Sequence, residues 1–536
     1  MELIKTSIFI FLALLLIKII IRKLYHRQLQ PNYQPPGPRN LPIIGCMHHL
    51  LAGRLPHCAL RDLSLIYGPI MRLKLGEIHT IIISSAEAAK EIMQTHDIMF
   101  ASRPVSPSID VLFYGGKGLI FASYGEFWRQ MRRICTMELL SSKRVRSFRA
   151  IIEQEVSHLL QSINAASSAG VDINLSREFA NLSNNIMAIL VVGSRCEDQK
   201  LYLAALKEVI ELNSGFSLID LFPSMPDFIK SIAGFRQKLE RCRLKLDRII
   251  EKILQEHIEK RAQKSVDAED LTDVLLRIQQ DGNLQFPLLN DHIKAVINVR
   301  CNLLNDHIKA VINDILMAGS ETTATTLEWA ISELVRNPTV MKKAQREVRE
   351  AFGDGPTQII GEEKLMSGRL NYLQLVIKET LRLHTPVPLL LPRENKDRCK
   401  VMGYDIAART TVMVNAWAIG RNSKYWDEPE LFRPERFEEN QSDMKGAHFE
   451  MIPFGAGRRI CPGMHFASAM VEMTLAYLLY YFDWEYVAKN GEELDMSEAF
   501  GVAVRRKSPL YLLAKPCFPI SGARSNALAH PKSQKI

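Results

Sequence analysis

The chain has 536 residues, of which 47% are hydrophobic and 24% charged, and its formal net charge is +9. This composition is typical of a globular protein with a large core. The small basic excess is explained by a solvated surface, and it also suits an anionic membrane or an acidic protein partner. We find no basic run with interleaved aromatic residues, so nucleic acid is not an expected partner. Nine widely spaced cysteines without a C-x-x-C pair argue against a zinc ribbon or a disulfide framework.

The N-terminus predicts a membrane anchor. Residues 8–17 are almost entirely apolar, and the run continues past Lys18 to residue 21. A basic cluster follows at residues 22–27, whereas a cleaved signal peptide carries its charge before the apolar part. By the positive-inside rule, the side that carries this cluster stays in the cytosol. We therefore expect an uncleaved, single-pass anchor over residues 1–30; a cleaved signal and a buried helix are the alternatives.

A stiff segment separates this anchor from the body. Pro35-Pro-Gly-Pro38 cannot continue a helix, so we expect a proline-rich hinge over residues 31–40. Residues 41–515 are expected to form the catalytic domain. The tail at residues 516–536 has little periodicity and is predicted to be disordered.

Periodicity along the body predicts mostly helices and few strands. Strand patterns occur at 70–75, 80–84 and near 400–415. Helical patterns occur at 85–96, 127–140, 145–165, 176–193, 199–213, 228–263, 314–337, 339–352 and 371–384, and another long helix follows Pro462. The predicted fold class is mainly α with a small β portion.

An 11-residue segment is duplicated within residues 288–313. LLNDHIKAVIN occurs at residues 288–298 and again at 303–313, an offset of fifteen residues. Architectural repeats have more copies and longer periods, so this pair suggests a recent local duplication or a gene-model error. Fifteen extra helical residues would add about 22 Å and rotate the helix face by about 60°. Because the second copy runs directly into Asp314, we expect one copy to loop out rather than to lengthen the helix.

Two polar patterns need an explanation. In the apolar helix, Ala318-Gly-Ser-Glu-Thr-Thr323 places an acid and alcohols beside a glycine that costs about 1 kcal/mol of helix stability. Lys378-Glu-Thr-Leu-Arg382 sets Glu379 and Arg382 on one helix face, and a Pro-Glu-Arg436-Phe segment follows downstream. Taken alone, the first pattern could be a harmless polar face and the second a surface ion pair.

The segment Phe454-Gly-Ala-Gly-Arg-Arg-Ile-Cys461-Pro-Gly463 is the most informative one. A glycine-rich loop with two arginines, just before a helix, favours a thiolate at Cys461. A thiolate is a strong donor to haem iron, and Gly455 and Gly457 allow a close approach to a flat cofactor. The local order does not fit a dinucleotide-binding turn.

These residues match the F-x-x-G-x-R-x-C-x-G loop of cytochromes P-450, and the other motifs follow in the family's order. The chain resembles cytochromes P-450 over residues 33–515, most closely plant microsomal members, and among these the terpenoid oxidases of the spurge family, such as those acting on casbene. The resemblance implies the cytochrome P-450 fold, haem b with Cys461 as its axial iron ligand, and an endoplasmic reticulum membrane location.

The resemblance also implies roles for the other motif residues. Gly319 would give room for dioxygen, and Glu321 with Thr322 would relay protons to it. Glu379, Arg382 and Arg436 would form a buried structural triad. The haem itself would be held by Trp128, Arg132, Arg393, Phe454 and Arg459.

A substrate pocket and a partner follow from the same resemblance. Ala318, Val387 and Val502 would line an apolar pocket, together with parts of 106–120 and 214–221, which suits a hydrophobic substrate. A flavoprotein reductase in the same membrane would supply electrons from NADPH. The expected reaction is hydroxylation, epoxidation or further oxidation of a plant terpenoid or diterpene. The alternatives are a reductase-independent haem isomerase or dehydratase, a fatty-acid epoxygenase, and an inactive mis-spliced product.

Overall fold

The computed structural model describes residues 33–50, 53–195, 199–212, 217–225, 234–263, 269–280, 297–353, 370–440, 442–487, 492–499 and 501–520. The predicted anchor, most of the first duplicated copy and residues 521–536 of the predicted tail lie outside these ranges. Among the described residues, the structure contains no helix with the length and apolar character that a membrane crossing requires.

Helices form most of the described structure, as the periodicity predicts. The longer ones are α2 (Pro56–Tyr67), α5 (Glu126–Cys135), α7 (Arg149–Ser168), α8 (Leu175–Val192), α9 (Gln199–Leu212), α12 (Phe235–Ala262), α13 (Leu271–Gln280), α14 (Ile297–Arg336), α15 (Pro338–Phe352), α17 (Asn371–Leu383) and α20 (Met464–Tyr481). The short ones are α3 (Ala86–Lys90), α4 (Pro107–Leu112), α6 (Ser142–Ser147), α10 (Leu218–Leu221), α18 (Ala416–Ile419) and α19 (Arg436–Glu439).

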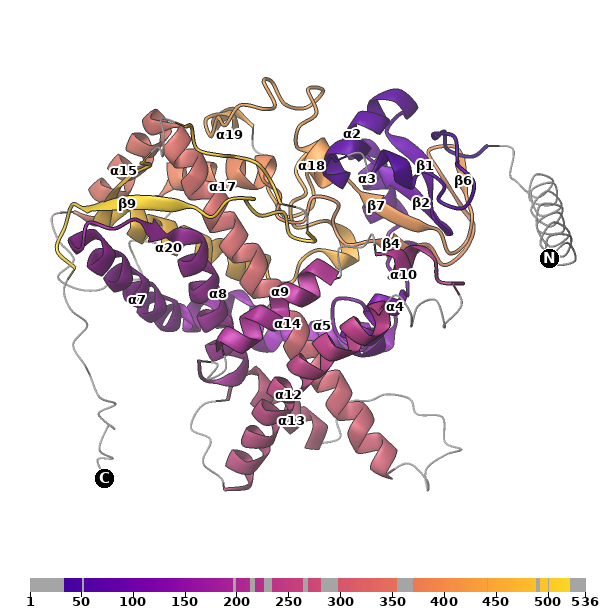
Figure 1. Cartoon of the computed structure of the whole chain (residues 1–536), viewed down its shortest axis with the longest axis horizontal. Coiled ribbons are helices and arrows are strands. Elements are labelled where there is room, and N and C mark those ends of the chain that lie inside the picture. The colour runs from indigo at the N-terminus through magenta and orange to yellow at the C-terminus, as the bar shows by residue number, and fades with distance from the viewer. Residues whose placement is uncertain are drawn as a thin grey trace, which may run out of the picture.

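The described residues also form three small sheets. One has the order β1 (Ile70–Leu75), β2 (Ile78–Ile83), β7 (Thr411–Val414) and β4 (Arg393–Glu394), with β2 and β7 parallel. The second has the order β3 (Ile173–Asn174), β9 (Tyr511–Pro516) and β8 (Phe482–Glu485), and the third pairs β5 (Cys399–Val401) with β6 (Tyr404–Ile406). In Figure 1 the first sheet and α2 lie together at one end, and the helical part fills the rest.

Helix α14 crosses the centre of the molecule, and α8 packs along it (Figure 1). It begins at Ile297, so the predicted start at Asp314 is wrong. The second duplicated copy is entirely helical and continues the buried face of α14 with Ile308, Val311 and Ile312. That apolar face explains why the helix extends toward its N-terminus instead of beginning at Asp314. Since most of the first copy lies outside the described residues, the expectation that one copy loops out stays a prediction.

The proline-rich hinge packs against the sheet. Arg72 in β1 donates its backbone N–H to Pro36 O at 2.7 Å, and a Cβ on Gly37 would lie 1.9 Å from Arg72 O.

At the C-terminal end of the described chain, the Cys517 backbone N–H donates to Tyr481 O at 2.8 Å, and the Phe518 ring stacks on Tyr480. The first residues of the predicted tail therefore belong to the folded body.

Candidate active site

A cavity of about 270 Å³ lies beside the middle of α14. Its walls come from helices that include α5, α8, α14, α17 and α20 and from the loops between elements, and they are mostly apolar. It is lined by these predicted site residues: Trp128, Arg132, Ala318, Gly319, Thr322, Val387, Arg393, Phe454, Arg459 and Cys461. Motifs that are far apart in the chain therefore meet around one cavity.

The cysteine loop forms one wall of this cavity. Cys461 precedes α20, its backbone N–H donates to Phe454 O at 2.9 Å, and it lines the cavity. Gly457 has φ of +68°, and a Cβ there would lie 2.0 Å from Met93 O, so only glycine fits this close approach. Burial raises the pKa of the Cys461 thiol, while the Gly463 N–H and Arg132 favour its thiolate. A bound metal ion would remove that proton outright.

Arginine side chains gather at the same cavity. Arg459 lies 4.1 Å above the Trp128 ring and donates from Nε to Ala101 O at 2.6 Å. Arg393 donates from Nη2 to Ala456 O at 2.9 Å, and its Nη1 lies 3.5 Å from the carboxylate of Asp97. The indole N–H of Trp128 already donates to Leu119 O at 3.0 Å.

The charge at this wall fits a dianionic ligand. Burial and repulsion by Arg393 and Arg132 lower the pKa of Arg459 to about 9, and burial lowers that of Arg393 to about 10. The Nη1 atoms of Arg393 and Arg459 are buried and have no hydrogen-bond partner among the described residues. Two propionate groups would supply the missing acceptors and negative charge. The donor set, with a thiol opposite, therefore fits haem.

The face of α14 toward the cavity carries Asp314, Ala318 and Thr322 at four-residue spacing. The Thr322 hydroxyl donates to Ala318 O at 2.7 Å. A Cβ on Gly319 would lie 2.6 Å from the sulfur of Met187 in α8, so this glycine also permits the close contact of the two helices. Glu321 is half-buried and is not part of the described cavity wall.

Two charged residues of this cavity were not predicted from the sequence. Burial raises the pKa of Asp314 to about 7, and its carboxylate accepts hydrogen bonds from the backbone N–H groups of Leu119 and Ile120. Arg103 donates from Nε to Ile120 O at 3.2 Å and from Nη1 to Leu391 O at 2.8 Å. Together they join α14, the loop around Ile120 and the loop around Leu391. The only sequence signal for either residue is that Asp314 precedes Ala318 of the AGSETT motif by four residues, which is one helical turn.

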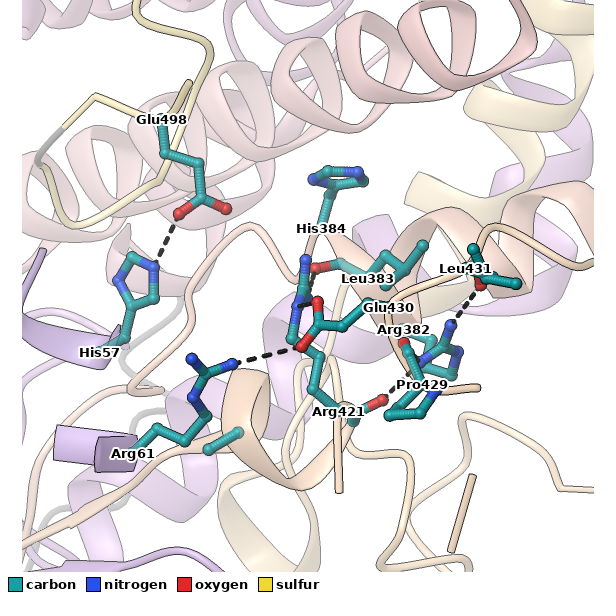
Figure 2. Close-up of polar contacts among 12 residues, drawn as sticks. His57, Arg61, Arg382, Leu383, His384, Arg421, Pro429, Glu430, Leu431 and Glu498 are labelled. Atoms are coloured by element: carbon teal, nitrogen blue, oxygen red, sulfur yellow. Dashed lines mark hydrogen bonds and ion pairs between the residues drawn. The ribbon is translucent and has the colours of Figure 1, made fainter. Parts of the chain in front are cut away.

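The predicted triad is assembled away from the cavity. Glu379 accepts from Nε and Nη2 of Arg382 at 2.7 and 2.8 Å, and from Nε of Arg436 at 2.9 Å. Arg382 also donates to the backbone carbonyls of Pro429 and Leu431 (Figure 2). Because the Glu379 and Arg382 side chains are 0% exposed, these bonds replace all of their contacts with water.

A second cavity of about 150 Å³ adjoins the first. Val387, Leu390 and Leu391 line both. Val502, which was predicted to line the substrate pocket, lines the second cavity and not the first. Parts of the predicted segments 106–120 and 214–221 also reach the second cavity, through Ser106 and Leu221.

The family profile described as "Cytochrome P450" matches residues 35–513. The chain belongs to the cytochrome P450 family. It is similar to desmethyl-deoxy-podophyllotoxin synthase of Sinopodophyllum hexandrum, with 49% identity over 89% of this chain and 91% of the relative. It is also similar to 5-epiaristolochene 1,3-dihydroxylase of Nicotiana tabacum, with 43% identity over 96% and 98%. A zebrafish cytochrome P450 structure with progesterone superposes with a TM-score of 0.71 at 26% identity, over 87% of this chain and all of that one.

Membership of the family confirms the predicted resemblance to cytochromes P-450, the mainly helical P450 fold and the enzyme class. This P450 is a monooxygenase with a haem-thiolate iron, and electron supply by a reductase is standard for the family.

Proposed function

We propose that this P450 binds haem through Cys461 and inserts one atom of dioxygen into a hydrophobic plant terpenoid. The observation that carries this assignment is that Cys461 and a set of buried arginines line one mostly apolar cavity. Bound there, haem supplies the activation of dioxygen. The protein's own residues supply the thiolate, the propionate contacts, the protons and the orientation of the substrate.

Arg132, Arg393 and Arg459 hold the haem propionates in this proposal. The Nη1 atom of Arg459, which has no hydrogen-bond partner among the described residues, provides a donor for one carboxylate, and the Arg393 guanidinium, 3.5 Å from Asp97, provides another. Trp128 acts through packing, because its ring supports Arg459 and its N–H is already used by Leu119 O. Phe454 would contribute part of the wall against which the haem packs, and the Cys461 sulfur would bind the iron.

Thr322 and Glu321 deliver protons to the oxygen-binding position. Thr322 lines the cavity, and rotation about its Cα–Cβ bond turns its hydroxyl from Ala318 O toward the open space. Glu321 lies next to Thr322 and is half-buried. It takes up protons from water outside the cavity and passes them toward Thr322. Gly319 keeps the helix backbone accessible beside Ala318.

The substrate class is supported by the cavity and by the relatives' names. Ala318 and Val387 give the wall an apolar character that suits a terpenoid skeleton. The tobacco relative is named for dihydroxylation of 5-epiaristolochene. A substrate of the podophyllotoxin type is the second candidate, because the Sinopodophyllum relative has 49% identity. In both cases residues 1–30 would anchor the enzyme in the endoplasmic reticulum membrane, with the reductase beside it.

Reductase-coupled turnover tests this function. Full-length enzyme in microsomes is given NADPH and a reductase, then a terpene panel and desoxypodophyllotoxin. We expect an oxygenated product that requires both NADPH and reductase. Thr322→Ala should lower product per NADPH about tenfold or more, because proton delivery contributes roughly 10²–10⁴-fold. Thr325→Ala, a buried threonine of α14 outside the cavity wall, is the matched control. Turnover of a hydroperoxide without reductase would contradict the monooxygenase reaction and support the isomerase or dehydratase.

A further inference from the structure

The second cavity contains a buried hydroxyl group without a partner. Thr80 of β2 lines this cavity and is 1% exposed, and its Oγ1 has no hydrogen-bond partner among the described residues. Thr411 of β7 lies opposite Thr80 in the parallel pairing and lines the same cavity. Because an unpaired buried hydroxyl costs free energy, a polar atom that entered the cavity would be stabilised by bonding to Thr80.

Two other polar side chains at this cavity, Asp220 and His57, already have partners. Asp220 accepts a 2.9 Å hydrogen bond from the backbone N–H of Ser108. His57 of α2 directs Nε2 at Glu498, with 2.8 Å between Nε2 and Oε2 (Figure 2). Thr80 therefore differs from both, since its hydroxyl remains available for a ligand.

The two cavities have wall residues in common, and Cys461 lines the first cavity while Thr80 lines the second. Val387, Leu390 and Leu391 line both spaces. Leu390 has φ of +49°, in the left-handed region that a leucine rarely adopts, so the surrounding fold holds this wall in a strained shape. A long ligand bound past these three residues would occupy both cavities.

We propose that the second cavity holds the end of the substrate remote from the oxidised carbon, and that this end carries a hydroxyl or carbonyl oxygen bonded to Thr80. This inference rests on the proposed function and narrows its substrate class. The substrate would be an elongated terpenoid that already contains one oxygen atom. The reaction that supplies such a substrate is an earlier oxygenation or hydration at the opposite end of the hydrocarbon skeleton.

The test compares ligands that differ only in one oxygen. Phytane with phytanol, and 5α-androstane with 5α-androstan-3β-ol, are titrated into full-length wild type, Thr80→Val and Thr80→Ser. The readout is the ratio of the two dissociation constants within each pair. Partition into lipid or detergent affects every variant equally, so it cancels when ratios are compared between variants. Thr80→Val removes the hydroxyl at constant shape, and Thr80→Ser is the matched control that keeps it.

We expect wild type and Thr80→Ser to bind at least one alcohol about tenfold more tightly, relative to its hydrocarbon, than Thr80→Val does. Hydrocarbon binding should be the same in all three. An unchanged ratio in Thr80→Val, or no binding of either alcohol, would overturn the inference. A reduced carbon-monoxide spectrum of each sample separates the two proposals: a missing haem-thiolate band in wild type would overturn the proposed function, whereas a normal band with an unchanged ratio would overturn only this inference.

Discussion

The carboxylate of Asp314 accepts a 2.8 Å hydrogen bond from the backbone N–H of Ile120, and this bond joins α14 to the loop that covers the cavity. The same loop is tied to the other side of the site, because the Leu119 carbonyl accepts from Trp128 and the Ile120 carbonyl accepts from Arg103. The position of the cavity wall above Ala318 therefore depends on a buried acid in the middle of the central helix.

The ionisation of Asp314 should make stability depend on pH. Burial raises its pKa to about 7 in the folded protein, from 3.8 when exposed. Between these values the folded state binds more protons than the unfolded state, so the stabilisation is complete below about pH 4 and is lost as pH rises through about 7. The loss is on the order of 4 kcal/mol at most. We expect the urea midpoint of Asp314→Asn to fall less between pH 5 and pH 8 than that of wild type. Parallel profiles would show that the carboxyl titrates normally.

Gly118 should tolerate no side chain. A Cβ there would lie 2.2 Å from Oδ2 of Asp314 and 3.1 Å from Ala310 O, so Gly118→Ala must displace the loop from α14. We expect loss of thermal stability and a changed product distribution, since Leu119 and Ile120 would move with it. Gly125→Ala is the matched control, because its Cβ would meet nothing within 4 Å. Equal melting temperatures for the two variants would contradict this packing.

A Glu→Gln substitution in the triad should lower the free energy of unfolding much more than the same substitution in a nearby exposed ion pair. Glu379→Gln leaves Arg382 and Arg436 buried without a counter-charge, at a cost of about 3–5 kcal/mol. Glu428→Gln affects a carboxylate that is 55% exposed and pairs with Arg433, which is 39% exposed, so about 0–1 kcal/mol is expected. Denaturant unfolding and the yield of haem-loaded protein measure the difference. A similar loss in both variants would mean that the buried charges matter no more than the surface pair.

The duplication should be dispensable. Deleting residues 288–302 or 299–313 gives the same sequence, in which one copy runs directly into Asp314. The remaining copy keeps the lysine that pairs with Asp247 at 3.2 Å and the aspartate that pairs with Lys117 at 2.9 Å. We expect the shortened protein to load haem and turn over substrate at least as well as the full chain. A lower haem content in the deletion variant would show that the extra fifteen residues are required.

The sequence predicts most of the site because its chemistry is concentrated in short motifs. Cys461 with its glycines, Thr322 on the apolar helix, and Glu379 with Arg382 are each recognisable within a few neighbouring residues. Long periodic helices such as α8 and α20 are predicted well for a related reason, since their apolar faces repeat over many turns.

Features that depend on approach between distant segments could not be predicted. Arg103 functions through carbonyl groups at Ile120 and Leu391, and no local pattern marks it. Thr80 is an ordinary strand residue until β7, His57 and Val502 close the second cavity around it. The start of α14 was misplaced because the apolar face of the second copy was attributed to an insertion rather than to the helix.

The carbon-monoxide difference spectrum of the reduced, full-length enzyme tests the central claim most directly. Wild type and Cys461→Ala are expressed in microsomes beside Cys399→Ala, which changes a half-buried cysteine outside both described cavities. We predict the red-shifted Soret band of a haem-thiolate in wild type and Cys399→Ala, and its absence in Cys461→Ala at equal protein level. A band that persists in Cys461→Ala, or that is missing from well-expressed wild type, would contradict the assignment of Cys461 as the iron ligand.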